Sequence, residues 1–262
     1  MHLPLLLTAS VDPRGMAGAD FVAVEREQMY VETLAYYLQT LPPEQPIVFA
    51  ENSGWELAAL QRKVAGGERV EWIEVNPKLS DQSRGKGYNE LILIDEAVRQ
   101  SKWIRAVGAF MKVTGRYPIY NLGFFVRRAG YWLGERGYSF YGDMKDHRLY
   151  DWFKPGWCGH AGSAALFATT VKNYQANISP RRPWLNDAEG RMLEHLLFDY
   201  MKPYRGTRGT VVCRFGREPV MGGLQGSNIA AASFSKDNRS MLARLKIAAG
   251  NLIRWTMPWF WF

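Results

Sequence analysis

The sequence has few of the residues that build zinc or disulfide proteins. It contains two cysteines, Cys158 and Cys213, no Cys-x-x-Cys pair, and only four histidines scattered over 262 residues. A zinc site is therefore not expected. The two isolated thiols are expected to be reduced and buried, which fits a cytoplasmic protein.

Long apolar runs and the common nucleotide fingerprints are also missing. No run of 18 apolar residues occurs, so no helix is expected to span a membrane. Residues 1–8 lack the positive charge and the long apolar core of a secretory signal, so we expect a buried strand there. Neither Gly-x-x-x-x-Gly-Lys-Ser/Thr nor Gly-x-Gly-x-x-Gly occurs, which argues against a P-loop or a Rossmann site.

The composition is that of a folded, basic protein. Hydrophobic residues make up 47% of the chain and charged residues 22%, enough for a large core and too few charges for global disorder. The net charge of +8 favours an anionic partner, which leaves nucleic acid, phosphorylated small molecules and an anionic membrane surface open. Solubility alone would also explain the charge.

The first hundred residues repeat a strand, a polar loop and a helix three times. Apolar runs that predict strands lie at 3–9, 46–50 and 70–75, and helical spacing of apolar residues lies at 21–41, 55–64 and 88–101. This order predicts an α/β fold with a parallel or mostly parallel sheet flanked by helices.

The pattern changes after Asn121. We expect antiparallel strands or irregular structure over the aromatic and glycine-rich residues 124–141. Helices are expected at 163–176 and 187–201, and a short strand at 210–214.

Polar loops follow the predicted strands. Ligands of parallel α/β sheets bind at the carboxyl ends of the strands, so these loops should converge on one site. The loop residues expected there are Thr8, Ser10, Glu51, Asn52, Ser53, Ser83, Arg84 and Lys86.

The segment Lys112-Val-Thr-Gly-Arg-Tyr-Pro-Ile-Tyr-Asn121 combines cations with a glycine directly after an amphipathic stretch. Lys112 and Arg116 are predicted to bind phosphates, because a guanidinium offers a planar fork and an ammonium a point charge. A basic surface turn is the alternative interpretation. The Gly85-Lys-Gly-Tyr-Asn-Glu90 segment opens a helix whose N-terminus favours anions, although Glu90 could simply complement the helix dipole.

Carboxylates in two places suggest catalytic or metal roles. Asp143 and Asp146 could hold Mg²⁺ or Mn²⁺ against a diphosphate, although their spacing is not Asp-x-Asp and a solvated loop explains Asp143 equally well. Glu194 lies at the edge of the apolar face of a predicted helix, where a carboxylate could take the proton of an acceptor hydroxyl. Its neighbour Glu189 is placed less favourably.

The tail differs from the rest of the chain. Apolar residues recur at helical spacing from Ser240 to Trp255 among arginines and a lysine, and Trp259 to Phe262 are all aromatic. A basic amphipathic helix with terminal aromatics suits the boundary of an anionic bilayer. Packing of this helix on the domain is the alternative.

Several segments, taken in order, resemble the small bacterial glycosyltransferases that build lipopolysaccharide and capsule glycans. The matching pieces lie between residues 5 and 228 and include Arg26-Glu-x-x-Tyr30, Val48-Phe-Ala-Glu-Asn-Ser-Gly54, Gly85–Glu90, Lys112–Tyr117, Asp146-His-Arg-Leu-Tyr150, Leu193-Glu-His195 and Gly222–Ser227. The resemblance implies a GT-A-like fold and sugar transfer from a nucleotide-sugar donor to a glycan or glycolipid acceptor. The acidic segment at 141–146 is longer than the motif expected there.

The resemblance and the polar loops together give a candidate site. Its predicted donor-binding residues are Thr8, Ser10, Glu51, Asn52, Lys86, Lys112, Thr114, Arg116, Asn121 and Arg148; its predicted catalytic residues are Glu194 and Asp146, and its metal ligands Asp146 and Asp143. We expect a catalytic domain over 1–235 and a membrane-associating tail over 236–262, in an enzyme at the inner face of the cytoplasmic membrane. A nucleic-acid-binding protein, which lacks sequence signatures here, and a non-catalytic membrane scaffold are the alternatives.

Overall fold

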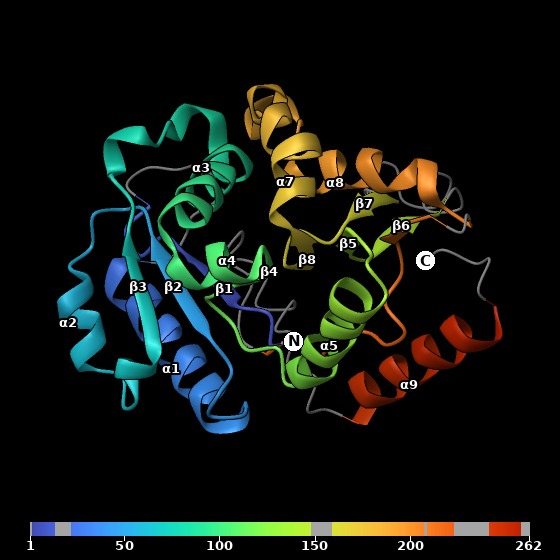
Figure 1. Cartoon of the computed structure of the whole chain (residues 1–262), viewed down its shortest axis with the longest axis horizontal. Coiled ribbons are helices and arrows are strands. Elements are labelled where there is room, and N and C mark those ends of the chain that lie inside the picture. The colour runs from blue at the N-terminus through green and yellow to red at the C-terminus, as the bar shows by residue number, and fades with distance from the viewer. Residues whose placement is uncertain (1, 14–21, 148–158, 207–208, 223–240, 258–262) are drawn as a thin grey trace.

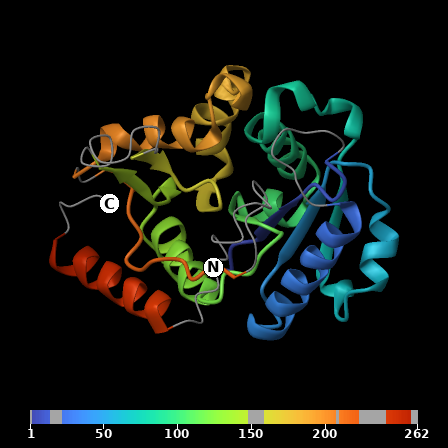
Figure 2. The same cartoon turned by 180° about the vertical axis from the view of Figure 1, so that it is seen from behind.

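The computed structural model describes residues 2–13, 22–147, 159–206, 209–222 and 241–257. Their centre is a seven-stranded sheet with helices above and below it in both views (Figures 1 and 2). The strands are β1 (Leu5–Ala9), β2 (Ile47–Glu51), β3 (Val70–Glu74), β4 (Ala109–Thr114), β5 (Phe140–Tyr141), β8 (Leu166–Thr170) and β9 (Val211–Val212). A separate antiparallel pair is formed by β6 (Met144–Asp146) and β7 (His160–Gly162).

The sheet is mostly parallel, as the sequence predicts. Its strand order is β3-β2-β1-β4-β8-β5-β9. Strands β3, β2, β1 and β4 run parallel to one another, and β8 is antiparallel to both of its neighbours. The chain therefore builds β2 and β3 on one side of β1 and β4 on the other, so the strand order switches direction between β1 and β4.

Two apolar layers hold the helices on the sheet, because successive side chains of a strand point to opposite faces. One layer joins alternate residues of β1, β2 and β4 to α1 and α5. The other joins the intervening strand residues to α3, α7 and α8. The helices are α1 (Ala23–Thr40), α2 (Leu57–Arg62), α3 (Gly85–Gln100), α4 (Lys102–Val107), α5 (Leu122–Ala129), α7 (Val171–Asn177), α8 (Leu193–Met201) and α9 (Met241–Thr256). A π-helical turn, η4 (Gly130–Glu135), extends α5.

The predictions for the first hundred residues are confirmed to within a few residues, but two later ones are wrong. The segment expected as strands or irregular structure contains α5 and η4, because Leu122, Phe125 and Ala129 have the helical spacing that buries one face. The helix expected at 163–176 is half strand. β8 occupies Leu166–Thr170, and α7 begins only where the Thr170 hydroxyl caps it by accepting from the Asn173 N–H at 3.2 Å.

The C-terminal helix α9 is present and is fastened to the body of the protein. Its Arg254 makes a bidentate pair with the buried Asp143 carboxylate, with Nη1–Oδ1 2.7 Å and Nη2–Oδ2 2.9 Å. The predicted boundary at 235–236 lies outside the described residues. Among the described helices, none is long and apolar enough to cross a membrane.

Candidate functional site

Polar side chains gather where β1 and β4 end. The register pairs Thr8 of β1 with Thr114 of β4, and Lys112 stands two pairs earlier, opposite Leu6, on the same face of the sheet. This is the place where the strand order switches direction, and crevices at such switch points bind ligands in open α/β sheets. The geometry therefore brings Thr8, Lys112 and Thr114 together, as the sequence predicts.

Lys112 is the centre of this group, but its ammonium is not open to a ligand. The residue is 0% exposed on the central strand β4. Its Nζ lies 2.6 Å from Glu90 Oε1 and donates to Thr114 Oγ1 at 3.1 Å and to the Ala164 carbonyl. Three acceptors satisfy the three N–H groups of an ammonium. The predicted direct phosphate contact of Lys112 is therefore replaced by a positioning role.

Glu90 is a site residue that the sequence predictions left out. It comes from α3, and its Oε1 accepts both the Lys112 ammonium and the Thr8 hydroxyl, the latter at 2.9 Å. It thereby links β1, β4 and α3 at the switch point. The Gly85–Glu90 motif contained the signal, since a carboxylate in the second turn of that helix faces the end of the sheet.

Glu194 lies in the first turn of α8, which packs on the same face of the sheet as α3 and Glu90. Its side chain is exposed to solvent, yet the surrounding protein removes enough water to raise its pKa above the ordinary value. The nearby carboxylates of Glu90 and Asp187 raise this pKa further, and Lys112 lowers it. A solvent-accessible carboxylate whose pKa is raised is suited to general base catalysis near neutral pH.

Tyr117 connects this carboxylate group to the predicted phosphate-binding arginine. Burial raises the pKa of its phenol, on which the charges of Arg116, Glu90 and Glu194 also act. The guanidinium of Arg116 lies 5.9 Å from the centre of the Tyr117 ring. Tyr117 is therefore a second site residue that the sequence predictions missed, although it stands inside the motif they singled out.

Two arginines approach each other beside the end of β1. Arg26 of α1 is buried and donates to the Ser10 carbonyl from Nε at 2.9 Å and from Nη2 at 2.6 Å. Burial lowers the pKa of Arg26 and the positive charge of Arg116 lowers it further, whereas Tyr30 and the nearby Asp12 carboxylate raise it. The half-buried Arg116 has an Nε without a hydrogen-bond partner among the described residues. Two guanidiniums in this arrangement favour an anion between or above them.

Three predicted donor contacts are used inside the protein instead. The buried Glu51 carboxylate accepts the backbone N–H groups of Val11, Ser53 and Gly54 at 2.9–3.1 Å and so ties two loops together. Asn52 is buried, and its Nδ2 donates to the Asn89 carbonyl at 3.4 Å.

Asn121 is the third. Its amide donates to the Glu218 carbonyl and accepts from the Val220 N–H, both at 2.9 Å. The end of the 112–121 segment is therefore paired with the strand-like residues 218–222, and Ile119 faces Met221 in an antiparallel bridge.

The N-terminus of α3 already binds an anionic group of the protein itself, the carboxylate of Asp187. Asp187 Oδ2 accepts the backbone N–H groups of Lys86 at 2.7 Å and Gly87 at 3.4 Å. The glycines of this motif make room for the segment that carries Asp187, because a Cβ on Gly87 would lie 3.0 Å from the Leu193 N atom. The predicted phosphate approach at this turn is corrected accordingly, and only the half-buried side chain of Lys86 remains a candidate contact.

Replacing Gly85 with alanine is expected to lower the free energy of unfolding by about 2–3 kcal/mol. Gly85 has φ of +82°, and an added Cβ would lie 2.5 Å from the Asp187 Cβ. Gly108→Ala is the matched control, since Gly108 has φ of +71° with nothing within 4 Å of the added atom, so only the backbone strain of about 1 kcal/mol remains. Urea unfolding measures both. Equal losses of unfolding free energy in the two variants would show that Asp187 moves away from the added Cβ without destabilising the protein.

The acidic residues predicted as metal ligands do not form a metal site in the described residues. Both oxygens of Asp143 are engaged by Arg254, and Oδ1 also accepts the Phe215 N–H at 2.8 Å. Asp146 lies 2.8 Å from His160 Nδ1 and pairs with Arg205. No group of three His, Cys, Asp or Glu side chains in this part of the chain could hold a metal. The described residues therefore do not fit the predicted Mg²⁺ or Mn²⁺.

Asp146 is also separated from the strand-end group. Its partner His160 packs on Phe198 in the middle of α8, and its partner Arg205 follows the end of that helix, whereas Glu194 stands at the beginning. No described contact joins Asp146 to Glu194, the other predicted catalytic residue. Arg148 lies outside the described residues.

Comparisons with known proteins give distant structural likeness only. No protein-family model matches the chain, and no curated protein matches it. The galactosyltransferase LgtC, in complex with donor and acceptor sugar analogues, shares 12% identity over 80% of this chain and 73% of its own, at a TM-score of 0.44. Core-mannan synthase A from Aspergillus fumigatus, in a Mn/GDP form, shares 7% identity over 77% and 69%, at a TM-score of 0.42.

A third structure, residues 1–349 of TarS from S. aureus, shares 12% identity over 80% of this chain and 57% of its own, at a TM-score of 0.42. With likeness at this level, nothing about the activity, substrate or cofactor of these proteins carries over to this chain. Its function is therefore argued below from its own residues.

Proposed function

We propose that this protein is a glycosyltransferase that moves a sugar from a nucleotide diphosphate to an acceptor hydroxyl. The observation that supports this most is the meeting of three groups at the β1–β4 switch point. These are an exposed carboxylate with a raised pKa, a buried Lys–Glu pair that fixes the strand ends, and two neighbouring guanidiniums. The ordered sequence resemblance to bacterial surface-glycan transferases supports the same class.

Each group has one task in the proposed reaction. The acceptor oxygen forms a bond to the anomeric carbon of the sugar while the bond from that carbon to the diphosphate oxygen breaks. Glu194 takes the proton of the acceptor hydroxyl. The negative charge that develops on the departing diphosphate is stabilised by Arg116, and the nearby charge of Arg26 adds to this stabilisation. Lys112 and Glu90 hold Thr8 and Thr114 in place. The proposed reaction does not involve a metal ion.

The finer parts of the proposal concern the acceptor and the place of action. The sequence resemblance favours a lipid-linked glycan acceptor in bacterial surface polysaccharide synthesis, at the inner face of the cytoplasmic membrane. The basic composition of the chain is compatible with this location, since the headgroups there are anionic.

Nucleotide binding tests the proposal directly. UDP-, GDP- and dTDP-sugars, with a CMP-sugar as a monophosphate contrast, are each added to the wild-type protein, and the melting temperature is measured. One diphosphate sugar should raise it, because a ligand that binds only the native state stabilises that state by mass action. The Arg116→Gln protein should lose about tenfold or more in affinity for this ligand, as expected when a charge-assisted contact to phosphate is removed.

Arg105→Gln is the matched control, because Arg105 is exposed on α4 and its Nε donates to the Ser101 carbonyl within its own helix turn. It should bind the sugar nucleotide like the wild type. The proposal fails if no diphosphate sugar shifts the melting temperature, with or without Mn²⁺. The assignment of Arg116 alone fails if both arginine variants bind equally well.

A further inference from the structure

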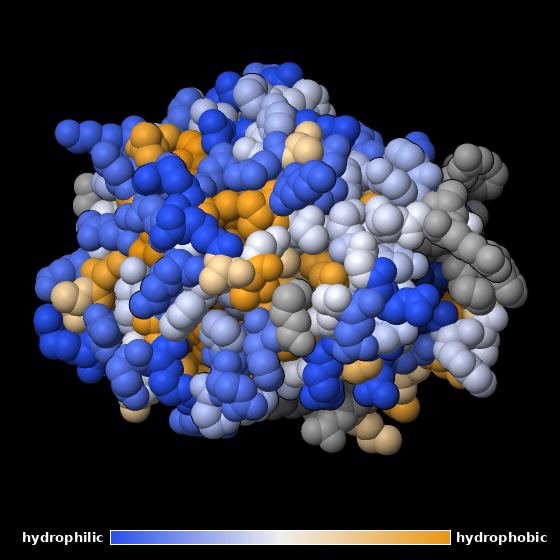
Figure 3. Space-filling view, viewed as in Figure 1, coloured by the Kyte–Doolittle hydropathy of each residue, from blue (hydrophilic) through white to orange (hydrophobic). Residues whose placement is uncertain are grey.

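Helix α9 carries an apolar stripe on the face turned away from the protein. Its members recur every three or four residues, which keeps them on one side of a helix. We call this the outer stripe; it consists of Met241, Leu245, Ala248, Leu252 and Trp255. Met241 is 78% exposed, Leu245 55%, Leu252 57% and Trp255 81%. Figure 1 places α9 at the lower right, where Figure 3 shows single orange, apolar atoms among hydrophilic ones.

Polar contacts on the opposite face fix this orientation. Asn251 Oδ1 accepts the Glu218 N–H at 2.9 Å, and Arg254 is buried against Asp143 and donates to the Phe215 carbonyl at 3.1 Å. The helix thus packs on the protein through Asn251 and Arg254, with Ile247 and Ile253 half-buried, and leaves the outer stripe exposed. An exposed apolar surface of this kind marks an interaction site.

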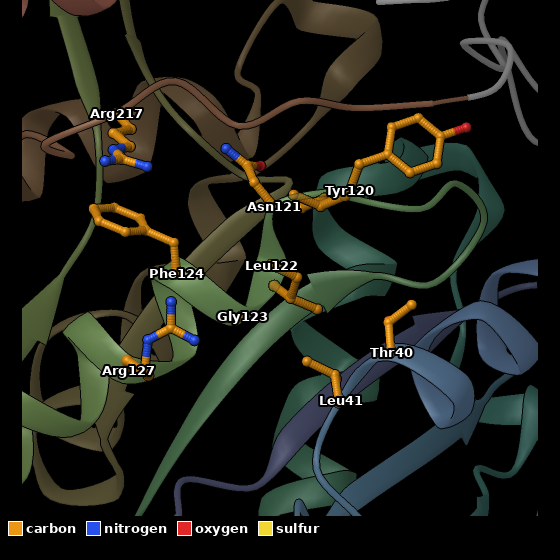
Figure 4. A pocket seen from close by; sticks show the side chains of 10 residues that line it. Thr40, Leu41, Tyr120, Asn121, Leu122, Gly123, Phe124, Arg127 and Arg217 are labelled. Atoms are coloured by element: carbon orange, nitrogen blue, oxygen red, sulfur yellow. The ribbon is translucent and has the colours of Figure 1, made fainter.

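A basic pocket lies next to the helix. It has a volume of about 320 Å³ and is lined by residues that include Phe124, Arg127 and Arg217. In Figure 4 the guanidiniums of Arg127 and Arg217 lie on either side of the Phe124 ring, and the Arg217 group is 4.9 Å from the ring centre. Arg217 directly precedes Glu218, whose N–H and carboxylate both contact α9. The pocket therefore lies near the chain segment that holds α9 on the protein.

We infer that this surface docks on an anionic lipid bilayer, with the outer stripe among the acyl chains and a lipid phosphate in the Arg127–Arg217 pocket. Charge complementarity favours lipid over a second copy of the chain, because two copies with a net charge of +8 repel each other. The helix Met241–Thr256 contains no acidic residue, and the sequence beyond it ends in four aromatics. Trp at such a surface anchors a helix at headgroup depth. The inference is independent of the proposed transfer reaction.

Vesicle binding by the full-length protein tests it. Partition is measured by co-sedimentation with phosphatidylcholine vesicles that do or do not contain phosphatidylglycerol. Leu245→Glu/Trp255→Glu should lower partition at least about tenfold on the anionic vesicles, and Arg127→Gln/Arg217→Gln should do the same. The pocket variant should bind pure phosphatidylcholine vesicles as weakly as the wild type does.

Matched controls change the same residue types elsewhere. Leu79→Glu/Trp184→Glu alters two exposed apolar residues of other segments, and Arg62→Gln/Arg181→Gln removes two exposed charges. Both should partition like the wild type. Thermal unfolding checks that every variant is folded, and Trp255→Ser, at the most exposed position of the stripe, repeats the test with a smaller change.

Three results would overturn the inference. In the first, the control pairs lose as much partition as the stripe and pocket variants. In the second, sedimentation equilibrium shows a dimer that the stripe variant abolishes while vesicle binding is absent. In the third, inorganic phosphate stabilises the wild type but not the pocket variant, and both partition equally onto anionic vesicles. That outcome would assign the pocket to free phosphate.

Discussion

The Glu194→Gln protein is expected to transfer sugar about 10²- to 10⁴-fold more slowly than the wild type, the range found when a general base is removed. The amide has nearly the same shape but cannot take the proton of the acceptor hydroxyl. Because the substitution leaves Arg116 and Arg26 untouched, affinity for the sugar nucleotide should stay within about threefold of the wild type. Glu189→Gln is the matched control, since Glu189 is an exposed carboxylate of the same segment that pairs with Arg191.

The pH dependence of the rate follows from the same group. The pKa of Glu194 is raised above its ordinary value because the surrounding protein removes water from the carboxylate and because other carboxylates lie nearby. A base works only when deprotonated, so the transfer rate should fall as the pH drops through this raised pKa. The Glu194→Gln protein should not show this fall of the rate. A wild-type rate that is flat down to the ordinary pKa of a glutamate would contradict the assignment.

As the pH falls, the contribution of Glu194 to the stability of the folded protein should rise while the transfer rate falls. Since the folded protein binds the Glu194 proton more tightly than the unfolded chain does, the contribution of this group to stability is full below the unfolded pKa and is lost as the pH rises through the folded pKa. At neutral pH the charged carboxylate therefore disfavours the folded state. Glu194→Gln should melt at the same temperature as the wild type or above it, and a variant that melts much lower would indicate a structural role instead.

The Arg254→Met protein is expected to lose about 3–5 kcal/mol of unfolding free energy, because it leaves the buried Asp143 carboxylate without its partner. Most domains have only about 5–15 kcal/mol in total, so a large share of the stability rests on this contact. Burial works against the charge of Arg254, but Asp143 outweighs it, and the pKa of Arg254 is raised. Denaturant unfolding measures the loss.

The double variant separates the ion pair from packing. Asp143→Asn/Arg254→Met keeps an acceptor for the Phe215 N–H and removes both charges, so it should recover most of the stability. Arg62→Met is the control, because the Arg62–Glu56 pair is about 70% exposed on both sides and should contribute less than about 1 kcal/mol. A double variant as unstable as Arg254→Met would show that the methionine fails to pack.

Much of the fold was predictable because its signals are local. The first three strands and helices follow from apolar spacing within about 20 residues, and α9 follows from the same kind of pattern. The errors came where local signals disagreed. Glycines and aromatics between 124 and 141 suggested strands, while the buried residues of α5 had helical spacing.

The site was predictable in place but not in detail. The loops after the strands point to the carboxyl ends of β1 and β4, and Thr8, Lys112 and Thr114 lie together there. The role of each charge depends on partners far along the chain, such as Glu90 for Lys112 and Asp187 for the start of α3. No local sequence pattern indicates such a distant partner, so the sequence alone does not distinguish a buried ion pair from a contact to a ligand.

The sequence by itself determined the α/β class, the strand-end location of the polar residues and the amphipathic character of the last helix, because these depend on periodicity along the chain. Only the tertiary structure decided which polar residues are used internally and which face solvent. Lys112, Glu51 and Asn121 satisfy the protein's own groups, whereas Glu194 reaches solvent. It also decided that α9 turns the outer stripe to solvent, since that orientation is fixed by Arg254 on Asp143, 111 residues away.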